Sequence, residues 1–443
     1  MMSTRRLIII GALMELAFLS FYLVDDPVLK VAAFIGVNTL VYVMLAAVVS
    51  SKMNSPSARS SHHPVIPLIL GFALLFRLTL IFHNPVCSDD IFRYIWDGKV
   101  SAAGINPYAF EPGNPALSHL HTTDLPSRIS FPEMRTIYPP LAQAFFWVSS
   151  KSFGDSIAGM KFLLLIADLL TMIILLRLLR LQDSRPETII LYAWSPVPIM
   201  YIALDGHIDG LGIPFLLLFL LFTSSEKKVR AGISLGLSSL AKLYPLLVVP
   251  LLLRTHWRIR HLWFPLLPLL LVLIGYSLYF EPTGGLFESL IVYNSTFSFN
   301  GSIFTIALQL LGSNQSAHLI CGALFLVMLS ALCLLNRTII TSTLLAFLGF
   351  LLLSPTVHPW YFTWIAALLV LRWSTATFVL LGLSNLSNVV VYQYRATGIW
   401  RDQPWLLLLE YLPFFLLLFH EIKTKRLFTK YTMIPPWTDI RPS

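Results

Sequence analysis

Long stretches of uninterrupted apolar residues constrain the fold of this chain more than any other feature. Many of them reach the length of about 20 residues that a helix needs to cross a bilayer. Their residues do not alternate between apolar and polar, as the strands of a membrane barrel do. With 56% hydrophobic and 12% charged residues among 443, the chain holds more apolar surface than one soluble core can bury. We therefore expect an all-α polytopic membrane protein.

The positions of the basic residues predict the orientation of the helices. Arg5 and Arg6 precede the first apolar stretch, and Lys425 and Arg426 follow the last, so the positive-inside rule places both termini in the cytoplasm. The first stretch lacks a small-residue cleavage pattern, and we expect it to be a helix and not a signal peptide. Counting the apolar stretches gives about 12–14 transmembrane helices. After the third apolar stretch, residues 84–156 form a long loop on the outer side of the membrane.

One apolar stretch is interrupted by charge and by proline. Residues 231–253 lie between two basic clusters that both belong on the cytoplasmic side, so this segment crosses an even number of times. Lys242, Pro245 and Pro250 lie at its centre, and proline breaks a helix because it lacks the N–H donor. We interpret the segment as a re-entrant hairpin with Lys242 near its apex, lining a cavity. Snorkelling of Lys242 toward a lipid headgroup is the alternative.

The remaining composition indicates no soluble domain and no obvious repeat. Residues 1–60 form a two-helix extension, and residues 61–443 form the main bundle. The net charge of +9 follows from cytoplasmic basic residues that face anionic lipid, so no nucleic-acid partner is expected. The three cysteines have neither disulfide nor zinc spacing, and we expect them to be packing residues.

The outer loop begins with a cluster of charge in the sequence CSDDIFRYIWDGKV. Asp89 and Asp90 stand at the start of a predicted helix, where acids are favourable as caps. Further along, Arg93 shares a face with Asp90 and Asp97, and its ion pairs with them would be structural. Asp89 lies off this face, at the mouth of the helix. It is therefore free to act as a general base.

Other ionisable residues lie in segments expected on the same side of the membrane. They are Asp205, His207 and Asp209 in DGHIDG, Asn300 in a later loop, and His358 at another turn. Such groups usually face a cavity when they lie near a membrane, so their recurrence predicts one shared site. Two local alternatives remain. DGHIDG alone also fits a plain turn, and an interfacial aromatic belt explains the rings of Trp360 and Tyr361.

At these residues the chain resembles the GT-C superfamily of polyprenyl-phosphate-sugar-dependent glycosyltransferases. The likeness is greatest to the bacterial mannosyltransferase-like branch and more distant to the first mannosyltransferase of GPI-anchor synthesis. SDDIFRYIWDGKVSAAGINPY resembles the modified DXD element of the family's first outer loop. Further blocks follow in the expected order, namely IYPPLAQAFF, DGHIDGLG, LAKLYPLLVVP, FSFNGSIF and SPTVHPWYFTW. The resemblance covers about residues 65–372 and implies a GT-C-type bundle with residues 61–443 as its catalytic domain.

The resemblance also implies an activity. A hexose, mannose before others, would pass from a polyprenyl-phosphate donor to a hydroxyl of a glycan or glycolipid, at the outer face of the cell inner membrane. Asp89 would be the base of an inverting displacement, and Asp90 would assist it. Asp90 could instead bind Mg²⁺ or Mn²⁺, but Asp-Asp-Ile replaces Asp-X-Asp here and leaves a metal requirement open. The residues expected to bind substrate are Lys242, His207, Asp209, His358, Tyr138, Asn300, Arg93 and Tyr361.

Three other functions are compatible with parts of this pattern. A secondary transporter would show repeats and a second broken helix matching the first, whereas the sequence shows one break, at Lys242. A membrane scaffold would leave the polar residues as caps and snorkelling groups. A ligase or polymerase that moves a whole lipid-linked oligosaccharide is the alternative within enzymes.

Overall fold

The computed structural model describes residues 4–53, 65–122, 125–255, 262–281, 285–335 and 337–424. Within these residues the protein is helical, and its only β pairing is two isolated bridges that join residues 299 and 300 to Thr356. The prediction of an all-α polytopic membrane protein is confirmed. Lys425 and Arg426, on which part of the predicted orientation rests, lie outside the described residues.

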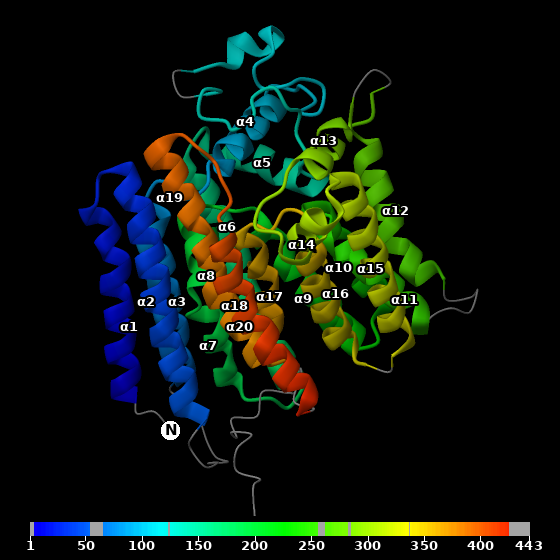
Figure 1. Cartoon of the computed structure of the whole chain (residues 1–443). Helices are drawn as coiled ribbons and strands as arrows, with labels where there is room; N and C mark the ends of the chain where they lie inside the picture. The colour runs from blue at the N-terminus through cyan, green and yellow to red at the C-terminus, as the bar shows by residue number, and fades with distance from the viewer. Residues whose placement is uncertain are drawn as a thin grey trace, which may run out of the picture.

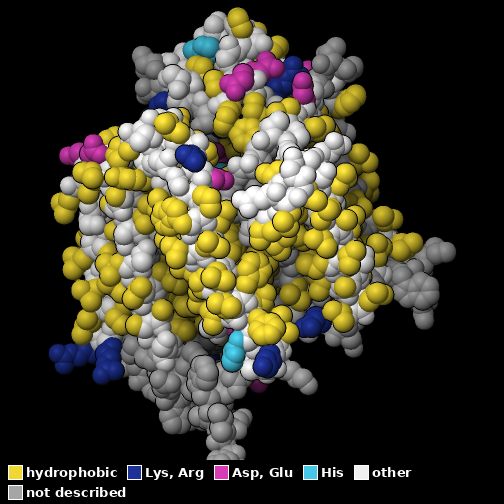
Figure 2. Space-filling model, viewed as in Figure 1, with side chains coloured by type: hydrophobic (Ala, Val, Ile, Leu, Met, Phe, Trp, Pro, Cys, Tyr) yellow, Lys and Arg dark blue, Asp and Glu magenta, His cyan; other side chains and the backbone are white. Residues whose placement is uncertain are grey.

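The helices stand side by side in a bundle with two distinct ends (Figure 1). At one end lie α4 (Asp90–Ala102) and α5 (Pro140–Phe153), and at the other α1 (Thr4–Leu19) begins and α20 (Pro404–Lys423) finishes. We call these the loop end and the terminus end. On the face seen in Figure 2, hydrophobic side chains cover the middle of the bundle, and charged side chains gather toward the two ends. This distribution fits a bilayer around the middle.

The N-terminal helices pack onto the rest of the bundle. They are α1, the 3₁₀ turn η1 (Ser20–Leu23), α2 (Pro27–Met53) and α3 (Val65–Ile81). The ring of Tyr42 in α2 lies 4.9 Å from that of Phe378, and the Tyr42 hydroxyl donates to the Phe378 carbonyl. Helix α2 is thus joined to a segment more than 300 residues away. The division at residue 60 stays a prediction.

The loop between α3 and α6 (Ile157–Leu181) contains α4, η2 (Pro115–Leu120) and α5. Helices α4 and α5 pack closely because Gly98 lacks a side chain: a Cβ there would lie 2.3 Å from the Phe146 carbonyl oxygen. Both faces of α4 are covered. Its residues 91–98 are all buried, and the Arg128 guanidinium from the loop lies 3.8 Å from the Phe92 ring centroid.

The middle of the chain contains two broken helices. After α6 come η3 (Pro186–Ile189), α7 (Ile190–Ala193), α8 (Pro196–Pro198), η4 (Ile199–Leu204), α9 (Asp209–Ser224), α10 (Lys228–Ala241), η5 (Tyr244–Val248), α11 (Val249–Thr255) and α12 (Trp263–Ser277). The span predicted near residues 188–204 is bent by 46° between α7 and α8, where Pro196 and Pro198 lack N–H donors. The expectation of a single break, at Lys242, was therefore wrong.

The chain at Lys242 follows the predicted hairpin. Helix α10 ends at Ala241, Lys242 is extended (φ −157°, ψ 139°), and η5 then begins with Tyr244 and Pro245. The start of α10 and the end of α11 line one cavity, through Lys228 and Leu251. The chain therefore returns to the end of the bundle from which α10 starts.

The C-terminal third adds the remaining helices. They are α13 (Glu288–Thr296), α14 (Ser302–Leu311), α15 (Asn314–Leu334), α16 (Ile339–Leu353), η7 (Pro359–Tyr361), α17 (Phe362–Leu369), α18 (Thr375–Leu383), η8 (Ser384–Ser387), α19 (Asn388–Thr397) and α20. Across the described residues, six helices are long and apolar enough to span a membrane, and the bent pair makes a seventh. Six further apolar helices have only 10–17 residues. The expected 12–14 crossings are reached only if these shorter helices are counted.

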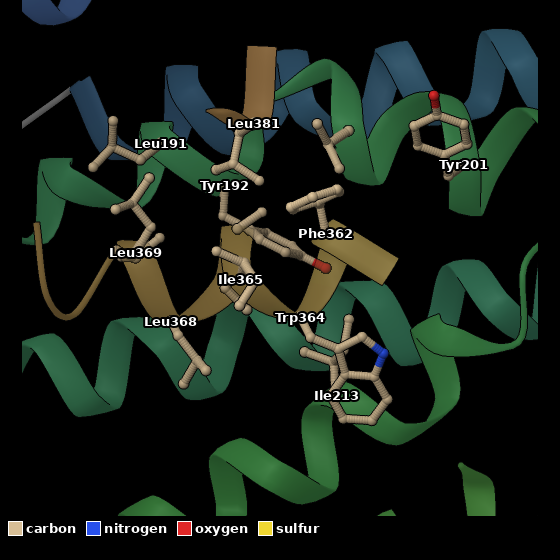
Figure 3. Packing of buried hydrophobic residues seen from close by; sticks show 14 of the residues in the cluster. Leu191, Tyr192, Tyr201, Ile213, Phe362, Trp364, Ile365, Leu368, Leu369 and Leu381 are labelled. Atoms are coloured by element: carbon tan, nitrogen blue, oxygen red, sulfur yellow. The ribbon is translucent and has the colours of Figure 1, made fainter. Parts of the chain in front are cut away.

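Helix α17 forms the centre of the core. All of its residues are buried, and Figure 3 shows Phe362, Ile365 and Leu368 among side chains of neighbouring helices that include Tyr192. Within a membrane this packing stabilises through van der Waals contact, because lipid tails are as apolar as the core. The packing also fixes Trp364, which is 1% exposed and whose indole lies beside α9.

Candidate active site

A buried carboxylate fixes the segment that precedes the two neighbouring acids. Asp205, which follows η4, accepts hydrogen bonds from the backbone N–H of Val86 (2.7 Å) and of Cys87 (3.2 Å). Ser88 Oγ then accepts from the N–H of Asp90 at 3.2 Å. Asp89 occupies the N-cap position of α4, but its side chain accepts no capping hydrogen bond. Capping therefore does not account for the Asp89 carboxylate.

Asp89 is held by an arginine that sequence analysis did not single out. Arg395 Nη2, from α19, lies 3.1 Å from Asp89 Oδ1 and 3.0 Å from Oδ2. Each side chain is 35% exposed, so the pair lies at a surface that solutes can reach. No local pattern could have revealed it, since 306 residues separate the partners.

Asp90 has different neighbours. Its Oδ2 lies 3.5 Å from His207 Nδ1 and 3.4 Å from the Tyr94 hydroxyl. Burial alone would raise the pKa of Asp90, but the interactions with His207 and Lys242 lower it below the usual value for aspartate. Asp90 is therefore ionised and electrostatically coupled to residues from two other segments.

The hairpin lysine pairs with the second acid of DGHIDG. Lys242 Nζ lies 2.7 Å from Asp209 Oδ1 and 2.8 Å from Oδ2, and Trp364 Nε1 donates to Asp209 Oδ1 at 2.7 Å. The ammonium also lies 4.3 Å from the ring centroid of Tyr361 and 5.0 Å from that of Tyr244. Lys242 thus points into the protein, and snorkelling to a headgroup does not describe it.

Two histidines enclose a tryptophan. The Trp360 ring stacks on His207 at a centroid distance of 3.9 Å and on His358 at 4.2 Å. Burial lowers the pKa of His358 to about 3, so this imidazole is neutral at physiological pH. His207 is fully buried, and within the described part of the chain its Nε2 has no hydrogen-bond partner. The alternative that Trp360 belongs to an interfacial aromatic belt is wrong, because this side chain is 9% exposed and packs inside the site.

Two of the expected residues frame the site. The Tyr138 ring meets Tyr94 edge-on at 4.9 Å. The Tyr361 hydroxyl lies 3.0 Å from that of Tyr293 in α13. These rings lie next to the charged residues, because the Tyr94 hydroxyl contacts Asp90 and the Tyr361 ring contacts Lys242.

Two other expected residues belong to separate networks. Arg93 Nε donates to Asp97 at 2.8 Å and its Nη1 donates to the Met134 carbonyl at 2.7 Å; the expected pair of Arg93 with Asp90 is not formed. Asn300 has a positive φ of 53° and donates from its amide to Glu410 at 3.1 Å. In the described residues no contact joins Arg93 or Asn300 to the acids or to Lys242. The Arg93–Asp97 pair is the i,i+4 pair that the sequence predicted. Helix packing, which the sequence does not report, brings Asn300 to Glu410.

The acid pair lacks the ligands of a typical metal centre. Among the described residues, no group of three or more His, Cys, Asp and Glu side chains could hold a metal ion. Both Asp89 oxygens face Arg395, and Asp90 faces His207. These residues therefore do not fit a bound cation in the arrangement they adopt.

Comparison with known proteins gives one family. The family model for the N-terminal domain of alpha-(1->6)-mannopyranosyltransferase matches residues 11–258. That is more than half of the chain, and it includes both acids, DGHIDG and Lys242, while His358 and Arg395 follow it. Comparison with curated proteins gives no match.

Proposed function

Because the chain belongs to the alpha-(1->6)-mannopyranosyltransferase family, we propose that it moves mannose from a polyprenyl-phosphate donor to an acceptor hydroxyl at the loop end. Family membership makes the protein a membrane glycosyltransferase, as the sequence predicted. The acceptor is a glycan or glycolipid. A secondary transporter would also fit the second break at Pro196, but the family decides for an enzyme.

The observation that supports this proposal is the arrangement of charge around the start of α4. Arg395 faces Asp89, and Lys242 faces Asp209 while also interacting electrostatically with Asp90. The carboxylates of Asp89 and Asp90 thus lie with the cations of Arg395 and Lys242 at one end of an apolar bundle. A lipid-linked sugar phosphate presents its reactive bond at this level while its tail stays in the bilayer.

We assign Asp89 the role of base and Arg395 that of a donor ligand. A carboxylate held at both oxygens by a guanidinium is a poor base. The donor phosphate competes for Arg395 through charge-assisted hydrogen bonds and so frees Asp89. Two N–H donors of the Lys242 ammonium bind Asp209. The third N–H of Lys242 binds the substrate.

The transfer is a single displacement. The acceptor oxygen attacks the anomeric carbon while the bond from that carbon to the phosphate oxygen breaks. The electron pair leaves with polyprenyl phosphate, whose charge Arg395 stabilises. The acceptor proton passes to Asp89. Inversion turns a β-linked donor into an α-mannoside, which agrees with the linkage in the family's description.

Transfer of radiolabelled mannose from polyprenyl-phosphate mannose by the purified protein tests the proposal. Asp89→Asn should lower kcat by about 100-fold or more, because the amide cannot accept the proton. Lys99→Gln is the matched control, since Lys99 lies in the same helix but pairs with Asp155, and it should keep near-normal activity. An Asp89→Asn enzyme with normal kcat would remove Asp89 from the role of base.

We place the loop end on the outer side of the cell inner membrane. The described basic residues support this placement, because Arg5 and Arg6 in α1 and Lys423 in α20 lie at the terminus end.

A further inference from the structure

A cavity lies far from the acids, at the terminus end of the bundle. Its volume is about 270 Å³. Helix α9 begins at Asp209 in the site, ends beside Thr223 in the cavity wall, and its 16 residues span about 24 Å. The cavity is therefore distinct from the site of transfer. It is lined by Thr223, Glu226, Lys228, Leu251, Leu252, Phe264, Leu332, Arg337, Ile339 and Ser342.

The cavity is electropositive. Lys228 and Arg337 outnumber Glu226, and neither basic side chain has an ion-pair partner within the described residues. Three helices, α10, α12 and α16, begin at its wall, and three others, α9, α11 and α15, end there. Their dipoles largely offset one another, so the charge of the cavity comes from its side chains. The N-cap residue of α10, Lys227, provides no side-chain hydrogen bond to the first turn.

The wall also contains a buried polar atom, Thr223 Oγ1, for which the described part of the chain offers no hydrogen-bond partner. Ser342 is 3% exposed and places a hydroxyl in the same wall. Buried hydroxyls are normally hydrogen-bonded, so the Thr223 hydroxyl favours a polar occupant.

The rest of the wall is apolar. Leu251, Leu252, Phe264 and Leu332 are each buried at 5% exposure or less. A phosphate ion alone would leave this surface without contact. A molecule with a phosphodiester beside hydrocarbon chains would match both parts of the wall.

We infer that this cavity binds the headgroup of an anionic glycerophospholipid. The phosphodiester lies between Lys228 and Arg337, the headgroup hydroxyls meet Thr223, Ser342 and Glu226, and the first chain carbons pack on the leucines. Basic pockets between membrane helices recognise anionic lipids through this combination of charge and apolar contact. The site is independent of the sugar-transfer reaction.

Native mass spectrometry of the delipidated protein in neutral detergent tests the inference. Phosphatidylglycerol should bind in preference to phosphatidylcholine, and inorganic phosphate should not compete at equal concentration. The double variant Lys228→Gln/Arg337→Gln should bind phosphatidylglycerol about 25-fold more weakly, at about fivefold for each basic residue.

A control double variant removes two positive charges from the terminus end of the bundle but outside the cavity. Arg180 and Lys423 lie in the last turns of α6 and α20 and do not line the cavity, so Arg180→Gln/Lys423→Gln should change affinity less than twofold. Equal loss in both double variants would show general attraction of anionic lipid and overturn the inference. Effective competition by inorganic phosphate would show an anion site without lipid selectivity.

A cavity-filling variant tests the inference independently, in case the charge variant binds less lipid because it is misfolded. Ser342→Phe keeps both cations but occupies the space, and it should also weaken phosphatidylglycerol binding. Its thermal unfolding without lipid shows whether the fold is intact. A folded Ser342→Phe protein with unchanged lipid affinity would place the lipid elsewhere.

Discussion

Among single residues, Lys242 and Asp209 show how a membrane protein keeps a charge pair inside its bundle. The Asp209 carboxylate is almost fully buried and the Lys242 side chain is 18% exposed. Trp364 adds a hydrogen bond to the same carboxylate. Each charge therefore depends on the other, because removing one leaves its partner buried without compensation.

Breaking this pair from one side should destabilise the protein more than removing both charges. Asp209→Leu and Lys242→Met should each lower the free energy of unfolding by about 3 kcal/mol. The double variant should regain at least half of the summed loss, since no unpaired charge remains. Thermal unfolding of the four proteins in detergent measures this coupling. Additive losses would mean that the two side chains act independently.

Arg395 should affect donor binding, because we assign it to the phosphate. Arg395→Gln should raise the KM for polyprenyl-phosphate mannose about 10-fold or more, as expected when a charge-assisted hydrogen bond is lost. Arg401, which is exposed beyond the same helix, supplies the control: Arg401→Gln should leave KM within about twofold. Steady-state kinetics with varied donor decides between these outcomes. A lower KM in Arg395→Gln would indicate that the arginine only obstructs the site.

At the scale of elements, α4 depends on its contact with α5. Gly98→Ala would place a Cβ against the Phe146 carbonyl oxygen, a backbone atom that cannot rotate away. We expect a loss of about 1–3 kcal/mol of stability and reduced transfer activity, because α4 carries Asp90. Gly71→Ala in α3 is the control, since a Cβ there meets nothing within 4 Å. Thermal unfolding and activity of both variants should differ accordingly, and equal behaviour would refute the packing argument.

The elements also show what local sequence predicts. Pro245 and Pro250 predicted the hairpin at Lys242, because proline breaks helices wherever it lies inside them. Pro196 and Pro198 could have predicted the bend of 46° by the same rule. That bend was missed because the surrounding residues are apolar enough to be counted as one unbroken span. A local rule thus existed for both breaks, and the count of apolar residues obscured one of them.

At the scale of the whole molecule, the two ends of the bundle should face different compartments. A cysteine in place of Ser118, which is exposed in the loop between α3 and α6, should react with a membrane-impermeant maleimide in intact cells. A cysteine in place of Lys423 should react only after permeabilisation. The native cysteines, of which Cys87 and Cys321 are buried, give the background labelling. The reverse pattern would invert the orientation and place the acids in the cytoplasm.

The sequence by itself determined the class of the protein and the chemistry available to it. Apolar stretches of bilayer length require a helical membrane protein, because only hydrogen bonds within the helix satisfy the backbone in lipid. The sequence also placed two acids at the start of a loop helix and a lysine at a helix break. Each of these properties follows from neighbouring residues, and neighbours are what a sequence shows.

Only the tertiary structure decided which charges meet. Arg395 reaches Asp89 across 306 positions, and Asp209 binds both Lys242 and Trp364. The same packing brings Asn300 to Glu410, away from the site that its residue type suggested. These partners depend on how distant helices pack, and packing is a property of the whole set of surfaces, which no single segment contains.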